Sequence, residues 1–311
     1  MLAPVVLFVY NRPIHTKQVI EALIQNTLAK DTELFIFSDH YKTKADEQSV
    51  LECRKYIQSI SSCYLGGFKK VHIICRDRNF GLADSIIDGV STIINKYGKA
   101  IILEDDIVVS NVFLDYMNSA LDKYEMQEKI WAISAWNYPI ASDDLGDCFF
   151  WRIPHCWGWA TWKNRWQYYK RDIDWVKKNF DSKDIKAINL GTYSSYWNDF
   201  VLNEQGKIKT WAIFNYLIAY KHNALTLMPS VSYIRQIGFD GSGTHCGDEE
   251  IFHFETINTK FPIEFPNNIE ESPLALLRIQ NFHRSLKKPF FTRAKNKLLR
   301  IFKKIFQSNK S

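Results

Sequence analysis

The first 110 residues alternate between short apolar runs and longer segments whose apolar residues have helical spacing. The runs are rich in β-branched and aromatic residues, as buried parallel strands are; they comprise residues 4–10, 34–37, 71–75 and 100–103. The helical segments between them comprise residues 16–28, 45–60 and 81–95. This β-α-β-α-β-α-β order predicts an α/β fold with a doubly wound parallel sheet and right-handed crossovers.

A polar cluster follows each of the four predicted strands. Asn11-Arg12, Ser38-Asp39, residues 76–79 and Glu104-Asp105-Asp106 stand in these places. The carboxyl ends of parallel strands lie at one edge of a doubly wound sheet, and ligands bind outside that edge. We therefore expect the four clusters to converge on one binding site.

Three adjacent carboxylates at residues 104–106 follow the apolar run AIIL. Their mutual repulsion is relieved by a cation or a hydrogen-bonded ligand. Mn²⁺ or Mg²⁺, held by one or two carboxylates and phosphate oxygens, is one reading. A solvated acidic turn is the other, and the sequence alone leaves both open.

Tryptophan is confined to the middle of the chain. All ten tryptophans lie between Trp131 and Trp211, and four of them fall between Trp157 and Trp166. Indoles fill protein cores, and we expect more than half of the ten to do so. Gly158, which stands between two indoles in the sequence, indicates close backbone approach. Trp157 and Trp159 are therefore our candidates for lining a cleft in which a sugar donor meets its acceptor, as acceptor-binding residues.

The basic charge of the chain is concentrated at its end. Residues 284–311 hold ten basic residues and no acidic one, which leaves 30 basic and 34 acidic residues before them. An acidic body disfavours a nucleic-acid-binding protein. Residues 290–306 are amphipathic, with an apolar face opposite a basic one, as in helices that lie on anionic membranes. A helix docked on the body with its basic face solvated is the alternative.

The composition excludes several classes. Apolar residues make up 46% and charged residues 24%, as in globular proteins. No segment reaches the ~18 apolar residues of a membrane-spanning helix. The N-terminus lacks the features of a signal peptide. We expect a cytoplasmic protein, peripheral on the inner face of the cytoplasmic membrane.

The segments PVVLFVYNRP, LFIFSD, NFGLADSI, AIILEDD, PHCWGWATW and IGFDGSGTH resemble those of a bacterial glycosyltransferase of the GT-A fold. The resemblance is to the group related to N-acetylglucosaminyltransferase I, with the EDD form of the DXD motif, over roughly residues 4–250. It implies a Rossmann-like mixed sheet flanked by helices, a nucleotide-sugar donor such as a UDP-sugar, and Mn²⁺ or Mg²⁺ as cofactor.

The resemblance also implies roles for individual residues. Arg12 would contact the nucleotide diphosphate or base, and Asp39 would accept a hydrogen bond from uracil or the nucleoside. Asp106 would ligate the metal that bridges the diphosphate. Glu104 and Asp105 would hold the ribose or the donor sugar.

The glycine-rich segment from Gly238 to Gly247 could close over the diphosphate with its backbone N–H groups. His245 within it would then become a further metal ligand or phosphate partner. A loop that is rich in glycine only for its turns remains the alternative.

The general base is where the chain departs from this pattern. The related eukaryotic enzyme has an aspartate shortly after a tryptophan; Trp211 matches that tryptophan, but Ile213 stands at the aspartate position. An inverting transfer needs a group that accepts the acceptor's proton. Asp199 is our leading substitute and Asp240 the second, with helix capping as the other explanation of Asp199.

The sequence thus predicts a metal-dependent glycosyltransferase of surface-polysaccharide synthesis, acting on a glycan or lipid-linked acceptor. Residues 1–110 would bind the nucleotide-sugar, residues 111–283 would form the acceptor-binding and catalytic half of the same domain, and residues 284–311 would be a basic tail on the anionic membrane. The alternatives are a nucleotidyltransferase that makes an activated sugar and a non-catalytic sugar- or nucleotide-binding module.

Overall fold

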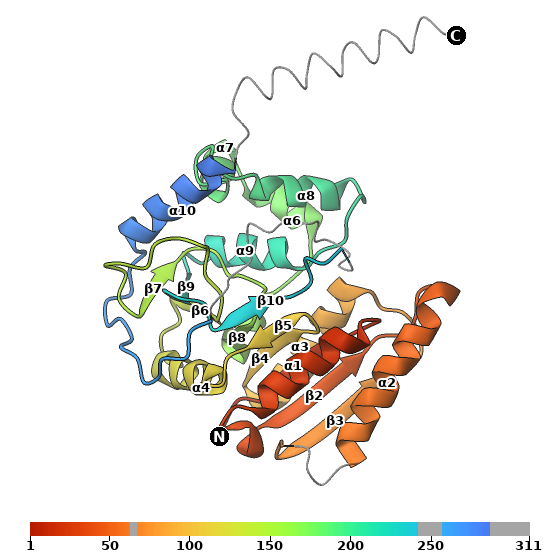
Figure 1. Ribbon diagram of the computed structural model, residues 1–311. Coiled ribbons are helices and arrows are strands. Elements are labelled where there is room, and N and C mark those ends of the chain that lie inside the picture. Colours follow the sequence, from red (N-terminus) through yellow and green to blue (C-terminus); the bar gives the residue numbers. More distant parts are fainter. Residues whose placement is uncertain (63–66, 242–256, 287–311) are drawn as a thin grey trace, which may run out of the picture.

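The computed structural model describes residues 1–62, 67–241 and 257–286. An eight-stranded sheet with helices on both faces dominates the molecule, and a separate ribbon of two strands lies beside it (Figure 1). The strands are β1 Val5–Val9, β2 Glu33–Ser38, β3 Lys70–Cys75, β4 Lys99–Glu104, β5 Ile107–Val109, β6 Ile130–Ser134, β7 Cys148–Trp151, β8 Trp159–Trp162, β9 Leu225–Pro229 and β10 Ile234–Gln236.

Ten α-helices are assigned in the described part of the chain. They are α1 Pro13–Ile24, α2 Glu47–Ser62, α3 Leu82–Tyr97, α4 Phe113–Tyr124, α5 Lys163–Trp166, α6 Ile173–Asn179, α7 Ser182–Ile188, α8 Tyr196–Glu204, α9 Ala212–Lys221 and α10 Pro273–Ser285. The short 3₁₀ helices η1 Ala29–Asp31 and η2 Lys44–Asp46 precede β2 and α2.

The sheet has the strand order β3-β2-β1-β4-β8-β6-β9-β7. The first four strands along the chain are parallel to one another. β8 is antiparallel to both of its neighbours, β9 is parallel to β6, and β7 is antiparallel to β9. The α/β class and the mixed sheet flanked by helices are therefore confirmed.

The continuous apolar run of β1 results from burial on both faces. Val5 and Leu7 join the core cluster that contains the apolar side of α1, whereas Val6 and Phe8 join the cluster that contains α3. A strand covered by helices on both sides has no solvent face, so its sequence cannot alternate. Pro13 begins α1, three residues before the start expected from the sequence, since proline is well suited to a first helical turn.

The aromatic segment holds a strand that the sequence did not predict. β8 inserts between β4 and β6, with Lys99 opposite Trp162 and Ile102 opposite Trp159. All four β8 residues are buried, so no period-two pattern reveals the strand. As expected, more than half of the tryptophans are core residues: seven of the ten are buried.

Two predictions fall wholly or partly outside the described residues: the amphipathic helix at 290–306 and most of the glycine-rich segment after Gly241. The last described helix is α10, and it packs against β7. No helix within the described ranges is both long and apolar enough to cross a membrane.

Candidate active site

The acidic motif lies at the carboxyl end of β4, near the centre of the sheet. Glu104 is the last residue of this strand, and Asp105 and Asp106 form the turn that leads into β5. Asp105 and Asp106 are buried, with 3% and 5% of their surface exposed, and Glu104 is half-buried. Because β1 pairs in parallel with β4, the residues that follow β1 meet the motif at the same edge.

Arg12 is the residue that meets it. Its Nη2 donates to Asp105 Oδ1, and its Nη1 lies 2.9 Å from Asp106 Oδ2. The chain places it there because only three residues separate the end of β1 from Pro13, which begins α1, and because the Arg12 carbonyl accepts the Thr16 N–H at 2.9 Å. Burial opposes the charge on the guanidinium, but the two carboxylates outweigh burial and the pKa of Arg12 is raised.

The pKa values of Glu104 and Asp105 are raised, whereas the pKa of an ordinary carboxylate paired with a cation is lowered. Burial, with the charges of Asp106 and Asp105, raises the pKa of Glu104 to about 8. Burial also raises the pKa of Asp105, although Arg12 and the Tyr10 N–H, 3.3 Å from Asp105 Oδ2, oppose the rise. Three carboxyl groups therefore share one resident cation, and the site favours a further positive charge.

Gly238 closes over the motif from the far side. It follows the ribbon strand β10, which pairs antiparallel with β5, and the Ile237 N–H donates to the Asp106 carbonyl at 2.9 Å. A Cβ at position 238 would lie 2.4 Å from Asp106 Oδ2 and 3.0 Å from Arg12 Nη1. Only glycine allows the backbone this close to the carboxylate. His245 and Gly247, from the same predicted segment, lie outside the described residues.

One oxygen of the motif fits a metal ion. Asp106 Oδ1 is buried and has no hydrogen-bond partner among the described residues. A single carboxylate, completed by phosphate oxygens and water, is a common way for proteins to hold Mg²⁺ or Mn²⁺ beside a nucleotide. Protein side chains alone do not form a complete metal site in residues 1–62, 67–241 and 257–286, which contain no group of three or more His, Cys, Asp or Glu that could hold a metal.

Asp39 lies at the same edge, at the end of β2, and holds two loops together. Its Oδ1 accepts the N–H groups of His40 at 2.8 Å and Phe80 at 2.9 Å. Its Oδ2 accepts Gly81 N–H at 2.9 Å and Asn79 Nδ2 at 3.2 Å. The side chain therefore fixes the start of α3 against β2, a role that the sequence did not predict.

Sequence reasoning also missed Arg54, a basic residue of α2. Its Nη2 donates to the carbonyls of Asp39 at 3.3 Å and Arg76 at 2.7 Å, so it braces the ends of β2 and β3. The only local signal in the sequence is an arginine within a segment of helical spacing. Helical periodicity alone does not distinguish it from a solvated charge.

A hollow of about 460 Å³ opens beside Arg12. Asn11, Arg12, Pro13, Ile14, His15, Gln18, Ile237 and Asp240 line it. The half-exposed Asp240 side chain has its Oδ2 3.2 Å from His15 Nε2. The structure thus brings Asp240, one of the two candidate bases, to the side of the acidic motif.

Asp199 is placed differently. It is exposed in the first turn of α8, which packs against α9. Asp199 is not among the residues that line the hollow beside Arg12, whereas Asp240 is.

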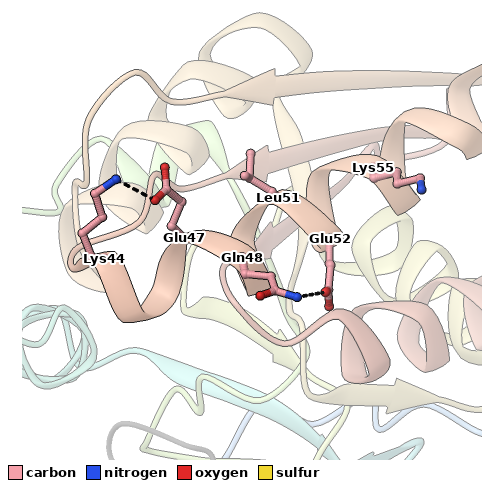
Figure 2. Close-up of a pocket in the computed structure, with 6 residues that line it drawn as sticks. All are labelled: Lys44, Glu47, Gln48, Leu51, Glu52 and Lys55. Carbon is pink, nitrogen blue, oxygen red and sulfur yellow. Dashed lines mark hydrogen bonds and ion pairs between the residues drawn. The ribbon is translucent and has the colours of Figure 1, made fainter.

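A second hollow, of about 500 Å³, lies on the outer face of α2 (Figure 2). Its lining side chains pair with one another: Lys44 Nζ lies 3.0 Å from Glu47 Oε2, and Gln48 Nε2 donates to Glu52 Oε1 at 3.0 Å. None of the residues predicted to act in the site lines it.

The two tryptophans chosen as acceptor platforms have separate positions. Trp157 is half-buried and packs edge-on against Trp136 and against Phe239, with ring centroids 4.8 and 5.8 Å apart. Since Phe239 follows Gly238, Trp157 lies beside the segment that covers Asp106. Trp159 is 1% exposed, and its ring stacks on Trp211 at 5.0 Å. It is a core residue, so its prediction as a cleft residue is wrong.

The close approach predicted at Gly158 is confirmed. Gly158 has a φ of +65°, and a Cβ there would meet the Ile234 side chain at 3.2 Å.

Ile213, which stands where the related enzyme has its aspartate, is 5% exposed and belongs to the core. A buried isoleucine on α9 is a packing residue, and its side chain cannot accept a proton.

Comparison with known proteins gives one family match. Residues 2–145, a little under half of the chain, match the model of the GNT-I family. No curated protein matches the chain. This stretch contains Arg12, Asp39 and the acidic motif, whereas Asp240 and eight of the ten tryptophans lie beyond it.

Solved structures show weak likeness. A structure of TarS from S. aureus is 10% identical, with a TM-score of 0.31, and the match covers 43% of this chain and 21% of TarS. The chain therefore spans about a fifth of TarS. An apo UDP-glucose pyrophosphorylase is 9% identical with a TM-score of 0.42, over 76% of this chain and 94% of that one. Neither likeness is strong enough to indicate an activity. Residues 2–145, however, are similar to the GNT-I family, the group that the sequence motifs resemble.

Proposed function

We propose that this protein transfers a sugar from a nucleotide-diphosphate donor, a UDP-sugar, to a hydroxyl group of a glycan or lipid-linked acceptor. The observation that carries the proposal is the joint position of Arg12 and Asp106 at the sheet edge, within the residues that match the GNT-I family. A guanidinium suits the diphosphate, and a carboxylate suits the metal that accompanies it. We propose residues 1–110 as the nucleotide-sugar half and residues 111–283 as the acceptor half.

Asp106 is the residue proposed to hold Mn²⁺ or Mg²⁺, through the carboxylate oxygen that has no partner in the described part of the chain. A bound metal would neutralise the charge that develops on the leaving diphosphate. Arg12 would hold the diphosphate from the side of α1, and Glu104 and Asp105 would hold the ribose or donor sugar. Asp39 would face the nucleoside while it keeps the start of α3 in place, and His245 would add a metal or phosphate contact.

The proton acceptor is proposed to be Asp240 or Asp199. The hollow beside Arg12 supports Asp240, because an acceptor hydroxyl there would lie near both the base and the donor. General bases contribute about 10²- to 10⁴-fold to rate. Asp240→Asn and Asp199→Asn should therefore be compared: the base is the residue whose variant loses at least a hundredfold in turnover with unchanged UDP affinity.

Trp157 is the proposed acceptor platform, since its ring is half-buried beside Phe239. Basic residues near an anionic membrane surface contribute about 1 kcal/mol each. We propose that residues 284–311 hold the protein on the inner face of the cytoplasmic membrane, where it would serve surface-polysaccharide synthesis. Full-length protein should co-sediment with vesicles that contain phosphatidylserine, and a chain ending at residue 285 should not. Equal sedimentation of both chains would contradict the tail's role.

The experiment that tests the function measures release of UDP from a panel of UDP-sugars with Mn²⁺, with and without candidate acceptors. Asp106→Ala should abolish turnover. Asp122→Ala is the matched control, because this aspartate on α4 is 65% exposed and pairs with Lys99 away from the acidic motif. Unchanged turnover in Asp106→Ala would refute the proposal. Release of pyrophosphate from UTP and a sugar 1-phosphate would instead identify a nucleotidyltransferase, and donor binding without turnover would identify a binding module.

A further inference from the structure

The acidic motif already has a cation bound to it, and that cation is part of the chain. Arg12 reaches both aspartates: Nη2 donates to Asp105 Oδ1, and Nη1 lies 2.9 Å from Asp106 Oδ2. The Arg12 side chain is 16% exposed, and the aspartate side chains are 4% and 7% exposed. The carboxylate proposed to ligate the metal is therefore also the partner of a buried guanidinium.

This pairing leaves two buried atoms of opposite character with unused capacity to bind a ligand. Asp106 Oδ1 has no hydrogen-bond partner within the described ranges, and Arg12 Nη1 has there only its ion pair with Asp106 Oδ2. Buried polar atoms without partners are costly, and natural proteins keep few of them. Nη1 can donate to an anionic oxygen, and Oδ1 can bind a cation.

A metal ion alone would satisfy Asp106 Oδ1 but would place a divalent charge beside the guanidinium. A diphosphate alone would satisfy Arg12 but would place its charge beside two carboxylates. A metal bound together with a diphosphate satisfies both atoms, since the phosphate oxygen accepts from Arg12 and the metal takes the carboxylate. The geometry therefore favours joint binding over binding of either part alone.

We propose that Arg12 makes divalent-metal binding at Asp106 conditional on the diphosphate. In the free protein the guanidinium serves as the counter-ion of Asp106 and repels the metal. A diphosphate then draws the guanidinium to itself, and the carboxylate is released to the metal. The inference rests on the proposed function, because it takes Asp106 to be the metal ligand.

The test measures Mn²⁺ affinity by electron paramagnetic resonance of free Mn²⁺, with and without saturating UDP, in the full-length protein. The Asp106→Ala protein, measured in parallel, gives the Mn²⁺ that UDP binds in solution, and this amount is subtracted. In the wild type, UDP should tighten Mn²⁺ binding at least tenfold. In Arg12→Gln, Mn²⁺ alone should bind at least tenfold more tightly than in the wild type, and UDP should tighten its binding by a smaller factor than in the wild type, because only direct ligation by the phosphate oxygens then couples the two.

Arg12→Lys is the second variant, because it keeps the positive charge and guards against misfolding of the glutamine variant. It should bind Mn²⁺ alone as weakly as the wild type. Equal Mn²⁺ affinity of the wild type with and without UDP would overturn the inference, and so would an Arg12→Gln protein that binds Mn²⁺ no better than the wild type. Either result is compatible with the proposed glycosyltransferase function if Asp106→Ala still abolishes turnover. Full turnover in Asp106→Ala overturns both proposals.

Discussion

Gly238 offers the most direct test of how the ribbon supports the acidic motif. In Gly238→Ala the new Cβ would start 2.4 Å from Asp106 Oδ2 and 3.0 Å from Arg12 Nη1. Cβ contacts shorter than 3.0 Å are essentially never seen, so the carboxylate or the backbone after β10 must move by at least about 0.6 Å. Both are restrained, because Arg12 pairs with the carboxylate and the Ile237 N–H is bonded to the Asp106 carbonyl.

Overpacking of this kind costs about 1–3 kcal/mol. A displacement approaching 1 Å at a binding site can reduce function about a hundredfold. We therefore expect Gly238→Ala to lower the free energy of unfolding in urea by about 2 kcal/mol. We also expect it to weaken binding of UDP with Mn²⁺, measured by calorimetry, about ten- to a hundredfold.

Gly206→Ala provides the control. Gly206 has a φ of +66°, and apart from its two chain neighbours no described residue has an atom within 4 Å of the place that an alanine methyl group would take, so alanine there costs mainly backbone strain of about 1 kcal/mol. Gly206→Ala should lower the free energy of unfolding by about 1 kcal/mol without weakening the binding of UDP. Gly238→Ala should lower the free energy of unfolding less in an Asp106→Ala background than in the wild type, because the carboxylate that its methyl group would overlap is absent. The reasoning would fail if Gly238→Ala kept both wild-type stability and wild-type affinity.

Three further substitutions test other parts of the structure. Asp39→Asn should lower the unfolding free energy by about 1–3 kcal/mol, because an amide group must then face N–H donors from residues 79 and 81; a loss under about 0.5 kcal/mol would contradict the loop-fixing role. Burial, aided by His283, lowers the pKa of His155 to about 3, so the unfolded chain takes up the proton first and stability falls as the pH drops from about 6.5 toward 3. His155→Gln should remove about 1.4 kcal/mol of this loss between pH 7.5 and 5.5, and parallel stability curves for variant and wild type would refute it. Ile213→Asp should lower stability by about 3 kcal/mol or more without raising turnover, since position 213 is buried in the core; faster transfer would show that the base position is still in use.

The first half of the fold follows from local patterns. Each of the strands β1 to β4 is a short apolar run, and each connection has helical spacing, so alternation and crossover handedness determine the parallel order. That order alone brings Arg12 and Asp106 to one edge, although 94 positions separate them. The site's location was therefore predictable even though its contacts were not.

The second half depends on contacts that no local pattern encodes. β8 is buried on both faces, so its aromatic residues predicted a platform where the structure has a central strand. The error over Trp159 has the same origin, because indole side chains serve cores and sugar sites equally well. The contact of Gly238 with Asp106 joins segments far apart in sequence, and the glycine signal indicated only a loop.

Arg12→Gln and Gly238→Ala act on the same carboxylate from opposite sides, and this makes them informative together. Removing the guanidinium should tighten binding of Mn²⁺ alone, because it removes a competitor for Asp106. Adding a methyl group at position 238 should weaken it, because the carboxylate is displaced from its place. If both substitutions weaken Mn²⁺ binding, Arg12 supports the shape of the metal site and does not compete with the ion. Opposite effects would instead separate the charge of the guanidinium from the packing of the ribbon as two independent controls on Asp106.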